Sequence, residues 1–105
     1  MMSKTLWEIL VPKCDNTGKE YDLAHHHKWD ERVRSLAGGL TILKSAKGQW
    51  ISPEGQLFSE QMIPVRIYCD EPSIESILNL TLQHYDQKAV MAYEVSRNVK
   101  LKHRD

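Results

Sequence analysis

The stretch from Leu40 to Cys69, LTILKSAKGQWISPEGQLFSEQMIPVRIYC, decides the fold because it has the pattern of one long β-hairpin. Its centre, Ser52–Gln56, offers a proline for the turn and a glycine for a residue at positive φ. Strand-forming residues flank this turn on both sides. The predicted arms therefore run over about Leu40–Ile51 and Leu57–Cys69.

Folding the two arms about the turn predicts which residues face each other. Trp50 lies opposite Phe58, and Leu43 lies opposite Val65, pairs that favour packing within a sheet. Gly48 and Pro64 lie towards the middle of this ribbon. Proline cannot donate a hydrogen bond to a strand ladder, and glycine weakens a strand, so a bulge or an edge is predicted there.

The residues before the hairpin predict one strand and one helix. Apolar residues alternate from Thr5 to Lys13, so that one set of side chains points one way and the other set the opposite way. The first set is Trp7, Ile9 and Val11, and the second is Leu6, Glu8 and Leu10. Helical spacing follows from Leu23 to Ala37, with Asp22 as a good N-cap and glycine after the last turn.

The residues after the hairpin predict a second helix and a fourth strand. Asp70-Glu71-Pro72 is typical of a helix start, and an apolar face follows as far as Tyr85. The run Ala89–Val95 is predicted to be a strand that is apolar on both faces. Residues 97–105 are interpreted as a basic tail or a short edge strand.

This order of elements predicts a single α+β domain over residues 1–105 with the ferredoxin-like plan βαββαβ. Two helices would cover one face of an antiparallel four-stranded sheet, and the long hairpin would join strands two and three. The other face would be bare and partly apolar, and such a face usually meets a partner. We therefore expect a homo-oligomer, with a dimer favoured.

Composition excludes several classes of protein. Lys plus Arg and Asp plus Glu number 14 each, so no net charge attracts nucleic acid or an anionic membrane. No apolar run approaches the length of a membrane span, and the N-terminus lacks a signal-peptide pattern. We expect a cytoplasmic protein that binds neither nucleic acid nor membrane and that needs no cofactor.

Two resemblances to known families follow from these motifs. The segments Gly39–Leu43, Gly48-Gln49-Trp50 and Pro53-Glu54-Gly55 resemble a family of small bacterial proteins of unknown function, which implies an α+β fold and no catalytic residue. The segments Val65–Cys69 and Gln87–Tyr93 are similar to phage S-adenosylmethionine-degrading enzymes. That resemblance implies a small α+β trimer with sites between subunits.

Candidate ligand-binding residues are Arg66, Tyr68, Tyr93 and Trp50. Arg66 and Tyr68 share a face of the third strand, and Tyr93 lies on the fourth, so these side chains could line the open face together. We interpret the chain as an oligomeric binding module for a small ligand or a protein partner, held on the open sheet face or in a cleft between subunits. The alternative is a small cofactor-independent enzyme of the dimeric α+β barrel type, which acts on a small organic substrate.

The histidine triplet and the two cysteines are further candidates. His25, His26 and His27 cannot all face one metal, because successive helical residues point about 100° apart; we expect no metal site there. Cys14 and Cys69 lie at the C-terminal ends of strands one and three, which are expected to be parallel neighbours. The two thiols are therefore expected at the same end of the sheet, beside the starts of both helices.

Overall fold

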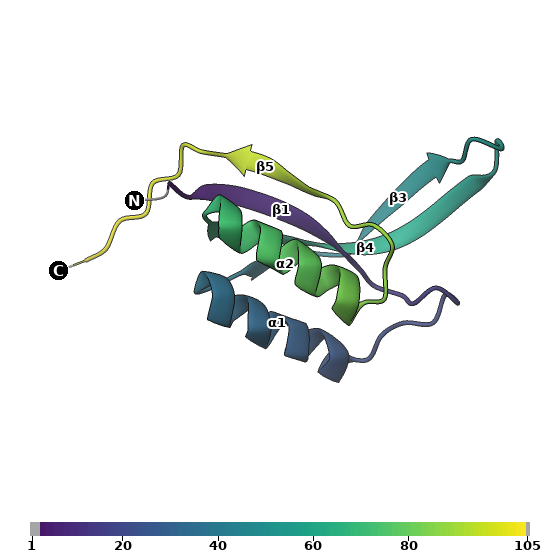
Figure 1. Ribbon diagram of the computed structural model, residues 1–105, viewed down its shortest axis with the longest axis horizontal. Coiled ribbons are helices and arrows are strands. Elements are labelled where there is room, and N and C mark those ends of the chain that lie inside the picture. The colour runs from purple at the N-terminus through teal and green to yellow at the C-terminus, as the bar shows by residue number, and fades with distance from the viewer. Residues whose placement is uncertain (1–2, 105) are drawn as a thin grey trace.

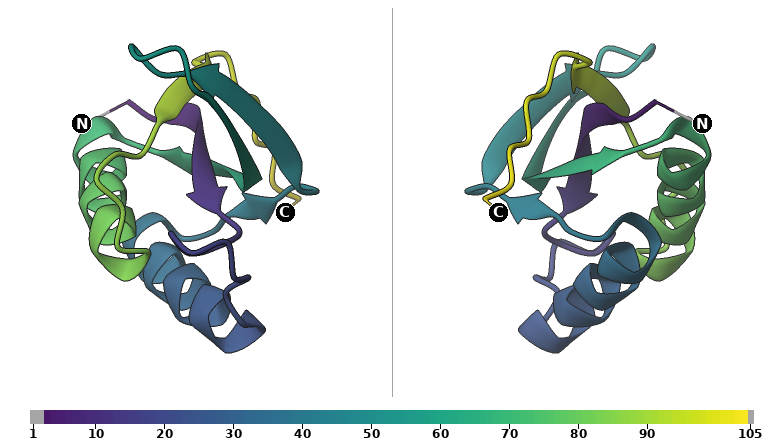
Figure 2. Two further views of the ribbon diagram at one scale, coloured as in Figure 1. Left: turned by 90° about the vertical axis from the view of Figure 1, so that its right-hand side faces the viewer. Right: turned by 90° about the vertical axis from the view of Figure 1, so that its left-hand side faces the viewer.

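The computed structural model describes residues 3–104, which form five strands and two helices in the order βαβββαβ (Figure 1). The bounds are β1 Thr5–Pro12, α1 Leu23–Ala37, β2 Thr41–Ile42, β3 Ala46–Ile51, β4 Leu57–Cys69, α2 Glu71–His84 and β5 Ala92–Ser96. The predicted ferredoxin-like α+β fold is confirmed. Both helices cover the same face of an antiparallel sheet, and the opposite face, here called the open face, carries no helix (Figure 2).

Both helices begin at the capping residues that the sequence predicts. The carboxylate of Asp22 accepts a hydrogen bond from a backbone N–H of the first turn of α1, and Asp70 does the same for α2, where Pro72 occupies the first turn. Gly38 ends α1 with a φ of 87°, a left-handed conformation that glycine adopts without a steric penalty. The helix boundaries thus follow from local chemistry.

The sheet has the strand order β2-β4-β1-β5, so β1 lies in its interior. β1 runs antiparallel to β4, with Thr5 opposite Cys69 and Pro12 opposite Met62. It also runs antiparallel to β5. The prediction that strand one is parallel to strand three, which is β4 in the structure, is therefore wrong. In the βαββαβ plan the parallel strands are those joined by a helix, and β1 and β4 are not joined in that way.

The first arm of the predicted hairpin is two strands, because three residues leave the ladder between β2 and β3. Trp50 lies opposite Phe58 as predicted, but Ile42, instead of Leu43, lies opposite Val65. The three residues 43–45 face only two on β4, which is a local bulge, and Leu43 N–H donates to the carbonyl of Pro64. The irregularity predicted for Gly48 and Pro64 thus occurs at the proline, while Gly48 pairs regularly.

The rest of the ribbon, residues 46–62, projects away from the helices and is called the hairpin arm (Figure 1). At the other edge β5 begins at Ala92, three positions after the predicted start at Ala89. Residues 97–104 form no strand in the part of the chain that the structure describes. No helix between residues 3 and 104 is long and apolar enough to cross a membrane.

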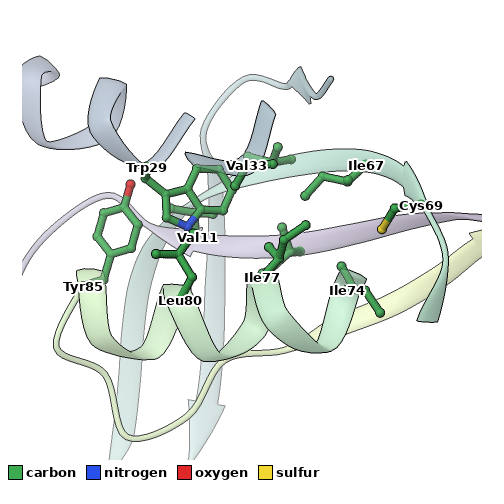
Figure 3. Close-up of a cluster of buried hydrophobic side chains, with 11 residues drawn as sticks. Val11, Trp29, Val33, Ile67, Cys69, Ile74, Ile77, Leu80 and Tyr85 are labelled. Carbon is green, nitrogen blue, oxygen red and sulfur yellow. The ribbon is translucent and has the colours of Figure 1, made fainter. Parts of the chain in front are cut away.

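The hydrophobic core lies between the helices and the sheet (Figure 3). Trp29 of α1 is its largest member, with 1% of its surface exposed, and its indole N–H donates a 3.0 Å hydrogen bond to the hydroxyl of Thr81 on α2. This bond satisfies two polar groups that would otherwise be costly to bury. The remaining buried apolar side chains are Ile9, Val11, Val33, Val65, Ile67, Cys69, Ile74, Ile77, Leu80 and Tyr85.

Candidate ligand-binding site

Glu8 stands at the centre of the open face because of the alternation in β1. Ile9 and Val11 point towards the helices and are 0% and 2% exposed, so Glu8, the residue just before Ile9, points the other way. Glu8 lies directly opposite Arg66 on β4 and directly opposite Tyr93 on β5. Side chains of directly opposed residues are within contact distance of each other. The central strand thus brings one carboxylate, one guanidinium and one phenol together.

These three side chains form one hydrogen-bonded group, called here the Glu8 triad: Glu8, Arg66 and Tyr93. The Arg66 Nε–H donates to Glu8 Oε1 over 3.0 Å, and the Tyr93 hydroxyl donates to Glu8 Oε2. Glu8 is only 8% exposed, whereas 42% of the Arg66 side chain is exposed. The triad therefore presents a partly open guanidinium and a phenol ring to the surroundings, while the carboxylate is covered and satisfied.

The hydrogen bonds of the triad fix its charges near neutral pH. The hydrogen bond from Tyr93, followed by that from Arg66, lowers the pKa of Glu8 below its usual value, although burial opposes this. The same hydrogen bond to the carboxylate raises the pKa of Tyr93 above its usual value. Glu8 is therefore an anion and Tyr93 a neutral phenol over a wide pH range.

Of the four predicted site residues, the structure joins Arg66 and Tyr93 through Glu8 and places Tyr68 beside them. Tyr68 lies opposite Leu6 at the next open-face position of β4. The ammonium of Lys4 is 5.7 Å from the centre of the Tyr68 ring, within the range of a cation–π contact. Tyr68 thus extends the face of the triad with an aromatic surface.

Trp50 lies elsewhere, near the tip of the hairpin arm. Its ring stacks on Phe58 with 4.5 Å between ring centres, and 48% of its surface is exposed. Phe58 precedes Arg66 by eight positions on the same strand, which is roughly 25 Å of extended chain. One copy of the chain therefore does not bring Trp50 to the Glu8 triad.

Glu8 is the residue that sequence analysis missed. Its signal was present: Glu8 is the one acid in the set whose other members, Leu6 and Leu10, are apolar. A lone acid on an otherwise apolar phase of a strand indicates a carboxylate that has partners, because an unpaired one would be costly to cover. The partners themselves come from β4 and β5, which no local pattern identifies.

The histidines lie at the junction between the start of α1 and the end of α2. His25 Nε2 is 2.8 Å from the backbone carbonyl of His84, and His84 Nε2 is 2.7 Å from the backbone carbonyl of His25. Because a carbonyl only accepts, each of these ring nitrogens carries a proton and donates. His26 Nδ1 is 2.7 Å from the hydroxyl of Tyr85. In the described part of the chain, no three His, Cys, Asp or Glu side chains lie close enough to hold one metal ion.

The two cysteines lie at opposite ends of the sheet, which corrects the prediction that they share one end. Cys69 is next to β1 at Thr5, whereas Cys14 lies beyond the other end of β1 and pairs with Glu20. Antiparallel pairing separates them by roughly 30 Å, far beyond the reach of a disulfide. Burial raises the pKa of the Cys69 thiol to about 11, so it is a packing residue. The starts of the two helices are at opposite ends for the same reason.

Comparison with known proteins supports the fold and assigns no function. No protein-family model matches the sequence, and no curated protein matches it. Among solved structures, a phage S-adenosylmethionine lyase in complex with S-methyl-5′-thioadenosine is similar with a TM-score of 0.68 and 14% identity, over 94% of this chain and 85% of that one.

Proteins described as CutA are similar to the same degree. The CutA of Xylella fastidiosa has a TM-score of 0.68 and 17% identity, over 94% of this chain and 88% of that one. The periplasmic divalent cation tolerance protein CutA of Archaeoglobus fulgidus has a TM-score of 0.67 and 12% identity over the same shares. At these identities the likeness establishes a shared ferredoxin-like fold, to which this chain belongs.

Proposed function

We propose that this protein is an oligomeric binding module that holds a small ligand at the Glu8 triad, in a cleft between copies of the chain. The observation that carries the proposal is a covered carboxylate, Glu8, that fixes an exposed guanidinium and a phenol in place on a face that no helix covers. Held side chains lose little freedom when a ligand binds, which favours affinity.

The hairpin arm supports assembly of several copies. Trp50 is 48% exposed, Ile51 68% and Leu57 60%, and the pairing puts Trp50 on one face of the ribbon and Ile51 on the other. A two-stranded ribbon has little stability of its own in water, and apolar residues on both of its faces favour cover from another molecule. A second copy of the chain supplies that cover in the proposed homodimer.

The electrostatics of the triad favour binding over proton transfer. A general acid or base works best when its pKa is near the operating pH. The hydrogen bond between Tyr93 and Glu8 lowers the pKa of Glu8 and raises that of Tyr93, so both pKa values move away from neutrality. The binding module is therefore preferred to the alternative of a cofactor-independent enzyme.

The exposed groups indicate the class of ligand. Arg66 offers guanidinium N–H groups that Glu8 does not use, and Tyr68 and Tyr93 offer ring faces for stacking. A small molecule with a flat ring and several hydrogen-bond acceptors fits this set, and a nucleoside is of that class. The structurally similar phage lyase is in complex with S-methyl-5′-thioadenosine, which makes this thioether nucleoside the first probe.

The test begins with the mass of the native particle by light scattering, followed by native mass spectrometry for retained small molecules. Calorimetry with S-methyl-5′-thioadenosine then compares the wild type with Arg66→Gln and with the control Arg97→Gln. Arg97 also pairs with a glutamate, Glu94, but it is in an exposed ion pair outside the triad.

The proposal expects an oligomer whose affinity for the probe falls by about tenfold in Arg66→Gln, as for loss of a hydrogen bond to a charged group, and stays unchanged in Arg97→Gln. A monomer, or equal affinities in both variants, contradicts the proposal.

We also propose a cytoplasmic location. Cys14 and Cys69 are both free, and thiols that remain unpaired are typical of a reducing compartment. The Archaeoglobus fulgidus neighbour is described as periplasmic, so fractionation of cells with an antibody against the protein is the direct test.

A further inference from the structure

A cavity lies on the helix-covered side of the sheet, beneath the first turns of α1. It has a volume of about 160 Å³, similar to engineered cavities that hold a molecule the size of benzene. Its wall is mostly apolar and includes Val11, Val65 and Trp29. Leu23 and Ile42 also line it and are 72% and 54% exposed, so the cavity opens to solvent beside them.

Asp30 brings an acid into this apolar wall. It lines the cavity, and only 9% of its surface is exposed. Across residues 3–104 its carboxylate has no hydrogen bond and no ion pair with another side chain. Burial raises the pKa of Asp30 above its usual value. No fully buried side-chain oxygen between residues 3 and 104 lacks a partner, so the Asp30 carboxylate keeps some contact with solvent. The charges of His27, His26 and Arg34 oppose the rise in its pKa. A cation inside the cavity would give this carboxylate a direct partner.

The neighbouring histidine does not supply that cation. His26 lines the same cavity, and its Nδ1 is 2.7 Å from the hydroxyl of Tyr85, so the ring is held by that contact. Burial lowers the pKa of His26 below its usual value, which keeps the ring neutral near pH 7. The cavity therefore combines an apolar wall, the neutral imidazole of His26, the ring of His27 and one acid that has no direct ion pair.

We propose that this cavity binds a small primary amine with a compact apolar body, whose ammonium group pairs with the carboxylate of Asp30. The body is limited to roughly six to eight non-hydrogen atoms by comparison with benzene-sized cavities. The carboxylate accepts charge-assisted hydrogen bonds from the ammonium, and the apolar wall removes the body from water.

This site is independent of the Glu8 triad. Val65 of the cavity and Arg66 of the triad are consecutive on β4, and consecutive side chains of a strand point to opposite faces. A ligand in the cavity thus touches none of the groups that hold a ligand on the open face.

The experiment measures binding of benzylamine, a cation near neutral pH, by titration calorimetry and by NMR shifts of backbone amides. Benzyl alcohol has nearly the same shape without the charge and serves as the ligand control. The variant is Asp30→Asn, which keeps the size of the side chain. The matched protein control is Glu31→Gln, which removes the same charge from the next residue of α1, one that does not line the cavity.

The proposal expects benzylamine to shift amides around the cavity and to bind the wild type and Glu31→Gln alike. Asp30→Asn weakens it by about tenfold or more, the effect of losing a hydrogen bond to a charged group. Asp30→Asn is expected to fold normally, because it keeps the size of the side chain and breaks no hydrogen bond or ion pair of the carboxylate, and thermal melting checks this. Benzyl alcohol that binds as tightly as benzylamine, an unchanged affinity in Asp30→Asn, or shifts confined to the open face would each overturn the proposal.

Discussion

At the scale of the residue, Glu8 holds the open face together. Glu8→Gln keeps the shape of the side chain but removes its charge, so Arg66 loses its ion pair and the pKa of Tyr93 falls towards its ordinary value. We expect a loss of about 1 kcal/mol in the free energy of unfolding, because Arg66 is partly in solvent and the pair is screened. Urea unfolding gives the free energy, and NMR of the Tyr93 ring gives its pKa.

The effect of Glu8 has a definite dependence on pH. Its pKa in the folded chain is lower than its ordinary value of 4.5, so the unfolded chain takes up the proton first as the pH falls. The stability that Glu8 adds is fully present above about pH 5 and is lost as the pH falls through 4.5 towards the folded pKa. A difference between wild type and Glu8→Gln that grows on acidification contradicts this account.

At the scale of the element, the end of α1 offers two adjacent glycines with different roles. Gly38 has a φ of 87°, whereas Gly39 is outside the left-handed region, and neither would bring a new Cβ within 4 Å of another group. Gly38→Ala is expected to cost about 1 kcal/mol of stability through backbone strain. Gly39→Ala, the matched control, is expected to be neutral or slightly stabilising. Equal effects in thermal unfolding would show that the left-handed cap does not matter.

The junction of α1 and α2 is expected to weaken in mild acid. Burial is the main cause that lowers the pKa of His84 and of His26 below the ordinary value of 6.5. The unfolded chain therefore binds protons first, and stability present above pH 6.5 is lost as the pH falls through the folded pKa values. His84→Gln keeps an N–H donor for the His25 carbonyl but cannot titrate. Its stability should fall less steeply than that of the wild type between about pH 7 and 5; equal slopes in denaturant titrations would contradict this.

At the scale of the whole molecule, the hairpin arm is expected to hold copies of the chain together. Trp50→Ser should reduce the mass of the particle in sedimentation velocity while leaving the helix signal in circular dichroism unchanged, because Trp50 is on the hairpin arm, where its ring stacks on Phe58. The control is Leu101→Ser. Leu101 is 68% exposed and lies in the C-terminal tail, outside any strand. Loss of the oligomer in both variants, or in neither, would argue against the arm as the contact.

The sequence by itself determined the elements of this protein. Alternation defined β1, capping residues placed both helices, and the Pro-Glu-Gly turn aligned Trp50 with Phe58, because each of these signals depends on residues close together in the chain. The register beyond the turn was predicted less well. One extra residue between β2 and β3 shifts the pairing, so that Val65 lies opposite Ile42 instead of Leu43. Nothing local in the sequence specifies that bulge.

Only the tertiary structure decided which strands are neighbours, and the site depends on that choice. Glu8 meets Arg66 and Tyr93 across 58 and 85 positions of sequence because β1 lies between β4 and β5. The same antiparallel pairing separates Cys14 from Cys69. The cavity at Asp30 likewise needs α1 to lie over β2 and β4. The physical reason is that side-chain alternation encodes the face on which a residue lies, whereas the partner across a sheet depends on how the whole chain buries its core.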